Sequence, residues 1–179
     1  MGLVKALAII VSLVLIAAFF LPYRALNEEG KTALELLRAT YSGAELERAA
    51  KEENFPLSRL DDDSLSAFEL CAWYAQSARG EEEDGLSAAL VTAVMAAGGA
   101  LALLAFLFSL AKKPVLLFLS AGAALLYELR FFQPFIAQEL PDRAWTSGIA
   151  ATVYPVAAAA LLLLAVILFA CKRAQKARA

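Results

Sequence analysis

The chain has 179 residues, of which 61% are hydrophobic and 19% are charged, and its formal net charge is −2. Soluble domains average about 45–50% apolar residues, so the composition favours a membrane protein, and the near-neutral charge excludes the broad basic surface of a nucleic-acid-binding domain. The sequence contains no histidine and only two cysteines, so it lacks the commonest general base and the ligands of a structural zinc site, and we expect no cofactor and no metal.

Four apolar runs predict an all-α integral membrane protein, a four-transmembrane-helix bundle with a small helical extracytoplasmic cap. A spanning helix needs about 20 apolar residues. The third run reaches that length only if Glu128 and Arg130 are tolerated inside it. The predicted order is transmembrane helix 1–22, outer helical loop 23–85, transmembrane helix 86–111, turn 112–113, transmembrane helix 114–138, outer loop 139–147, transmembrane helix 148–171 and basic tail 172–179.

The first run has a second interpretation as a cleaved signal peptide. Its apolar core from Ala6 to Leu21 is long for a signal peptide, and Pro22 to Leu26 offers no small-x-small cleavage site, which favours a retained helix. If the run is cleaved, three spans remain and the new N-terminus lies outside.

The lysines and arginines of short loops predict the orientation, because such residues concentrate on the cytoplasmic side. One cluster is Lys112-Lys113, and the other consists of Lys172, Arg173, Lys176 and Arg178. Two spans separate the clusters, so both can be cytoplasmic. The sequence therefore predicts both termini inside, most simply in the plasma membrane, and places residues 23–85, with fifteen acidic and seven basic side chains, outside.

The outer loop is predicted to form helices over Glu28–Thr40, Ala44–Glu53 and Ser64–Ala78, the last capped by Asp63 or Ser64. A segment of roughly sixty residues supports little core of its own. We therefore expect it to pack on the outer end of the bundle, with Phe68 or Trp73 as anchors.

Small residues at helical spacing predict the faces on which the transmembrane helices meet. The second run carries such a row from Ala89 through Ala93, Ala97 and Ala105 to Ser109. The third run carries Ser120, Ala124 and then Glu128, and the fourth is alanine-rich over 157–160.

Glu128 and Arg130 are charges inside a predicted span, which usually mark a site or a pairing. Pro155 cannot donate to the carbonyl of Ala151, so a kink is expected in the fourth helix. These features predict a polar recess in the outer half, lined by Glu128, Arg130, Gln133, Thr152 and Tyr154. The alternative is that Phe131, Phe132 and Phe135 mark the outer interface, with Arg130 extended toward the headgroups and Pro155 an ordinary membrane-helix proline.

Four helices with a large first outer loop resemble the plan of claudins and related four-span proteins in topology alone. The tryptophan and paired-cysteine signature of a claudin first loop is absent, since Cys71 is the only cysteine there. The resemblance assigns no residue a role.

The function predicted from the sequence is a non-enzymatic accessory or scaffold subunit that binds another membrane or extracytoplasmic protein, or a second copy of itself. The alternative is a small transporter, channel or lipid-binding protein that uses the recess around Glu128. An enzyme working with carboxylates alone is the least favoured reading, because Glu128 has no visible catalytic partner in the sequence.

Overall fold

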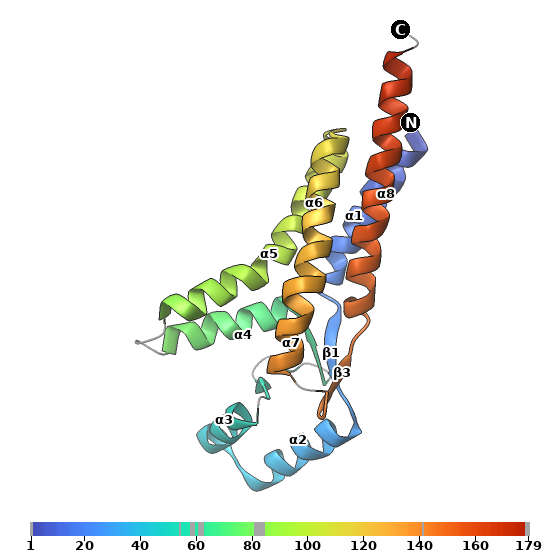
Figure 1. Cartoon of the computed structure of the whole chain (residues 1–179). Coiled ribbons are helices and arrows are strands. Elements are labelled where there is room, and N and C mark those ends of the chain that lie inside the picture. Colours follow the sequence, from blue (N-terminus) through green and yellow to red (C-terminus); the bar gives the residue numbers. More distant parts are fainter. Residues whose placement is uncertain are drawn as a thin grey trace.

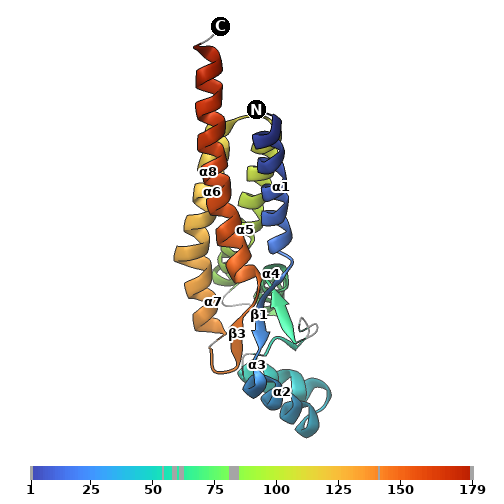
Figure 2. The same ribbon diagram turned by 90° about the vertical axis from the view of Figure 1, so that its right-hand side faces the viewer.

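The computed structural model describes residues 2–53, 55–57, 60, 63–80, 85–140 and 142–177, and it is mostly helical, as predicted. The long helices run in a common direction with both termini at one end, and the short helices of residues 28–52 lie at the other end (Figures 1 and 2). The helices are α1 (Gly2–Ala18), α2 (Glu28–Thr40), α3 (Gly43–Glu52), α4 (Ala67–Gly80), α5 (Gly85–Leu110), α6 (Pro114–Tyr127), α7 (Gln133–Glu139) and α8 (Ala150–Lys176).

Three helical stretches are long and apolar enough to cross a membrane. They are Leu90–Leu110, Pro114–Glu139 and Ala150–Gln175. α1 is also apolar but has only 17 residues, about 26 Å of helix at 1.5 Å per residue, against a hydrocarbon thickness of about 30 Å. These three stretches confirm that the chain is compatible with a membrane.

Small side chains allow the long helices to pack closely. α1 contacts α5 and α8, and α6 contacts the same two helices. The predicted row of Ser120, Ala124 and Glu128 on the third apolar run is buried. These residues lie on the face that α6 turns toward its neighbours.

The row predicted on α5 holds only in its second half, where Ala105 and Ser109 are buried. Ala93 is exposed, Met95 and Gly98 are buried in its place, and the side chain of Ala89 lies outside those described. The first half of α5 leaves the common axis and runs antiparallel to α4 (Figure 1), so a different face is covered there.

A three-stranded antiparallel sheet corrects the all-helical prediction for the part of the chain that was predicted to lie outside the membrane. Its strands are β1 (Pro22–Leu26), β2 (Ser64–Ser66) and β3 (Trp145–Ser147), in the order β2-β1-β3. α1 therefore ends at Ala18 rather than at residue 22, and a strand occupies the first three residues of the helix predicted over Ser64–Ala78. The polar groups of the β1 backbone find partners on both neighbouring strands, which outweighs local helical preference.

α4 begins with a capping box, which places its N-cap at Ser66 rather than at Asp63 or Ser64. The Ser66 Oγ accepts a hydrogen bond from the Glu69 N–H at 3.2 Å, and Glu69 Oε2 accepts from the Ser66 N–H at 2.7 Å. This reciprocal pair satisfies two donors that a helix start otherwise leaves free. Asp63 instead adopts a left-handed φ of 56° and its carbonyl accepts from the Leu26 N–H at 2.8 Å.

An apolar core joins the sheet to the ends of the long helices. Tyr23, Leu26, Ile136 and Trp145 are buried in it, and Trp73 packs against it partly buried. Phe68, the other expected anchor, is half exposed. Leu70 is the fully buried side chain that α4 supplies in its place.

Candidate functional site

A single π-helical turn, η2 (Glu128–Phe132), joins α6 to α7 and positions the buried carboxyl group of Glu128. Such turns insert an extra residue into a helix and are frequent at functional sites. Glu128 is 2% exposed, whereas Arg130, two residues later, is exposed. The turn thus separates the two charges, one into the protein and one away from it.

Tyr23 of β1 is the partner of Glu128. Its hydroxyl donates a hydrogen bond of 2.6 Å to Glu128 Oε1. The pairing of β1 with β2 is irregular between Pro22 and Arg24, and both Tyr23 and Arg24 are buried there. A bulge of this kind redirects side chains, which allows consecutive residues to serve two sites. Burial raises the pKa of the Tyr23 phenol far above its ordinary value, and the neighbouring Glu128 carboxylate raises it further, so this hydroxyl remains a donor at physiological pH.

Two further tyrosines close the space around Glu128 by bonding to α5. The hydroxyl of Tyr127 donates to the Met95 carbonyl at 3.0 Å, and that of Tyr154 donates to the Gly98 carbonyl at 2.7 Å. Gly98 permits this approach, because a Cβ at that position would lie 2.7 Å from Cε1 of Tyr127.

The cavity that Glu128, Tyr23 and Tyr154 share measures only about 10 Å³. A water molecule needs roughly 10–15 Å³ by the same measure. In this conformation the polar centre therefore accommodates one water at most and no larger ligand.

Tyr23 also lines a second, larger polar cavity of about 280 Å³. Arg24, Gln133, Asp142 and Thr152 are among the residues that line it. The Arg24 guanidinium is buried and its Nη1 lies 2.8 Å from Oδ1 of the largely exposed Asp142. The cavity thus combines the Arg24–Asp142 ion pair with hydroxyl and amide groups, as a site for a small polar ligand would.

The side chain of Gln133 binds a backbone carbonyl group that Pro155 leaves without a helical donor. Pro155 lies within α8 and has no N–H for the carbonyl four residues earlier, that of Ala151. The side-chain amide of Gln133 donates to this carbonyl at 3.1 Å. Gln133 therefore replaces the missing helical hydrogen bond, and α8 continues as an α-helix through the proline.

The five residues predicted to line one recess do not all line one cavity, although the side chains of Glu128 and Gln133 are close enough to interact. Glu128 and Tyr154 share the small cavity, and Gln133 and Thr152 line the larger one. Arg130 is exposed and lines neither of these cavities.

Sequence reasoning missed Tyr23 and Arg24, because both come from a strand far from Glu128 in the chain. The single available signal was a tyrosine followed by an arginine directly after an apolar run. Among the described residues, no group of three or more His, Cys, Asp or Glu side chains is arranged to hold a metal ion. Comparisons with protein-family models, curated proteins and solved structures find no match for this chain.

Proposed function

We propose that the chain is a non-enzymatic accessory protein of the plasma membrane that presents a helical arm to a partner protein outside the bilayer. In this proposal α1, α5, α6–α7 and α8 form a four-helix membrane bundle, and the basic end of the bundle is cytoplasmic. α1, at 17 residues, stands at the lower limit for a spanning helix.

The observation that carries the proposal is the arm formed by α2 and α3, which extends beyond the end of the long helices opposite the termini (Figures 1 and 2). Leu34 of α2 is buried in the apolar core that also contains Tyr23 and Trp145. Leu36 and Tyr41 are 67% and 42% exposed. These two exposed apolar side chains are the candidate contacts of the arm with a partner protein.

The base of the arm is joined to the body by hydrogen bonds and close backbone packing. Asn27 caps α2 by accepting from the Gly30 N–H at 2.8 Å, and its amide donates to the Arg143 carbonyl at 2.9 Å in the second outer loop. A Cβ on Gly30 would overlap the Ala144 carbonyl oxygen, so α2 approaches that loop at backbone distance. A preorganised arm loses little entropy on binding.

Charge indicates what the partner surface is like. Residues 28–53 contain seven acidic and four basic side chains. A partner with a basic rim around an apolar centre is complementary to such an arm. The partner can be a second copy of the chain, provided that the contact between the two copies is made by this same arm.

A photo-crosslinking amino acid at Leu36 tests the proposal in native membranes. We expect a discrete protein adduct from Leu36, and its loss when Tyr41 is changed to Asp. The same probe at Leu163, which is 68% exposed on α8, is the matched control and is expected to yield lipid adducts. Absence of any protein adduct from Leu36 would count decisively against the arm as a binding surface.

A second candidate function is movement of a small polar solute or proton. It is favoured by the position of Tyr23, which is the one described residue that lines both cavities. A change of the Tyr23 rotamer would connect the larger cavity with Glu128. In proteoliposomes, Glu128→Gln should then reduce uptake while Glu139→Gln leaves it unchanged. Equal uptake by both variants would reject this candidate.

A further inference from the structure

The end of the molecule that holds both termini carries two adjoining cavities between helices. One measures about 540 Å³ and lies between the start of α6 and the end of α8. The other measures about 190 Å³ and reaches Lys5 of α1. Lys113, Pro114 and Lys172 line both, so the two cavities form one continuous basic groove.

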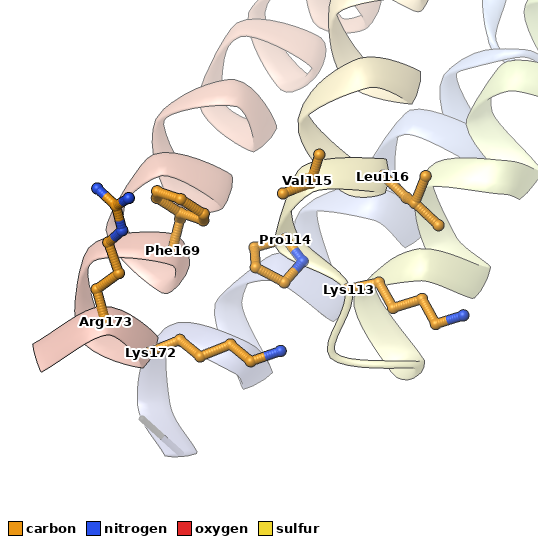
Figure 3. A pocket seen from close by; sticks show the side chains of 7 residues that line it. All are labelled: Lys113, Pro114, Val115, Leu116, Phe169, Lys172 and Arg173. Atoms are coloured by element: carbon orange, nitrogen blue, oxygen red, sulfur yellow. The ribbon is translucent and has the colours of Figure 1, made fainter. Parts of the chain in front are cut away.

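The walls of this groove are apolar and its rim is cationic. Val115 and Leu116 of α6 and Phe169 of α8 are the apolar residues that line the larger cavity, and Lys113, Lys172 and Arg173 line it as well (Figure 3). The guanidinium of Arg173 lies over the Phe169 ring, 5.2 Å from its centre. This cation–π contact holds the arginine beside the apolar wall.

The cations of the groove have no counter-ions in their own segments. Residues 1–27, 85–127 and 148–179 contain no aspartate or glutamate at all. The salt bridges found among the described residues, Arg24–Asp142 and Lys31–Glu28, are both in the outer half. The groove is therefore complementary to an anion from outside the chain.

The position of the groove selects the kind of anion. It lies where the stretches Leu90–Leu110, Pro114–Glu139 and Ala150–Gln175 begin or end, which is headgroup depth in a bilayer. Basic pockets between transmembrane helices on the cytoplasmic side bind anionic lipid headgroups. The first turn of α6, which lines the groove, adds the positive end of a helix dipole.

We propose that this groove is a binding site for one anionic phospholipid of the adjacent leaflet. Its phosphate lies among Lys113, Lys172 and Arg173, and one acyl chain lies along Val115 and Phe169 between α6 and α8. The inference requires the chain to be in a membrane, but it is independent of the arm and of any protein partner.

Native mass spectrometry of the full-length, delipidated protein, titrated with phosphatidylglycerol or phosphatidylcholine in mixed micelles, tests the site. Each basic contact near an anionic headgroup is worth about a fivefold change in affinity. The double variant Lys172→Gln/Arg173→Gln is therefore expected to weaken phosphatidylglycerol binding roughly 25-fold and to leave phosphatidylcholine binding unchanged. Lys172→Arg keeps the charge and is expected to bind as the wild type does.

A second pair of variants keeps every charge and fills the groove instead. Val115→Trp is expected to lower retention of phosphatidylglycerol, whereas Val156→Trp, at a lipid-facing position of similar exposure on α8, is expected to have no effect. Equal affinity for both lipids in the wild type, or unchanged binding in both the double variant and Val115→Trp, would overturn the proposal. Tight binding of soluble glycerol phosphate that phosphatidylglycerol cannot displace would likewise overturn it, because the site would then be for a free phosphate.

Discussion

Replacement of Tyr23 by Phe removes the one hydroxyl that donates to the buried Glu128 carboxyl group. The two side chains are 3% and 2% exposed, and their oxygen atoms are 2.6 Å apart. Hydrogen bonds to charged groups contribute about 1.5–3 kcal/mol. We therefore expect Tyr23→Phe to lower the free energy of unfolding by about that amount, which corresponds to roughly 3–12 °C in Tm for a chain of this length.

A double-mutant cycle separates this bond from other effects of the substitutions. Glu128→Leu leaves the Tyr23 hydroxyl without its acceptor and costs about 1–3 kcal/mol, while the double variant removes both polar groups. The cost of the double variant should therefore be smaller than the sum of the single costs by at least about 1 kcal/mol. Glu128→Gln retains an acceptor and should cost less than Glu128→Leu.

Unfolding of the purified protein in mixed micelles, induced by increasing SDS, measures these differences through the fluorescence of the two tryptophans. Trp145 is buried in the same apolar core as Tyr23, so its emission reports on this region. Tyr41→Phe removes a hydroxyl from an exposed tyrosine and serves as the control. If Tyr23→Phe unfolds within about 0.5 kcal/mol of the wild type, or if the cycle is additive, the hydrogen bond contributes nothing and the reasoning fails.

Three other predictions use the same unfolding assay or a labelling reaction. Gln133→Leu should destabilise the protein by about 1 kcal/mol. The loss should be much smaller in a Pro155→Ala background, because the new backbone N–H then donates to the Ala151 carbonyl. An equal loss in both backgrounds would show that Gln133 does not replace the missing helical hydrogen bond. Gly98→Ala should cost about 1–3 kcal/mol because its Cβ meets a tyrosine ring at 2.7 Å, whereas Gly122→Ala, with its nearest contact at 3.6 Å, should be tolerated. Burial raises the pKa of Cys71 to about 11, so the thiol is neutral at pH 7–8, and its maleimide labelling should be slow there and rise with pH up to about that value; rapid labelling at pH 7 would show that the Cys71 side chain is not buried.

Helix identity was predictable from sequence wherever a long periodic pattern or a helix cap was present. The boundaries of α2 were predicted as they are found, and α3 lies within one residue of its prediction. The buried row of α6 was also evident from the spacing of Ser120, Ala124 and Glu128.

The strands were not predictable in this way, because β2 and β3 have three residues each and show no measurable alternation. Their partners come from segments far apart in the chain, which local pattern cannot reveal. The N-cap of α4, in contrast, could have been predicted from local sequence, because Ser66 and Glu69 have the spacing of a capping box.

The candidate site was predictable in its chemistry and not in its assembly. Glu128 was identified as an unusual charge within an apolar run, but its partner Tyr23 is 105 residues away. The π-helical turn that separates Glu128 from Arg130 leaves no mark in composition. Gln133 could have been assigned to the Ala151 carbonyl, because the loss of a donor at Pro155 follows from the sequence alone.

The order of strands in the outer sheet sets an order of events during biosynthesis. β1 lies at the centre and is synthesised first, whereas β3 follows α7 and is synthesised last. Until residues 145–147 emerge, one edge of β1 is an open row of unpaired peptide groups, which invites pairing with the wrong chain. Chains that stop before β3 are therefore expected to aggregate or to be degraded, so that only a chain that includes β3 completes the sheet.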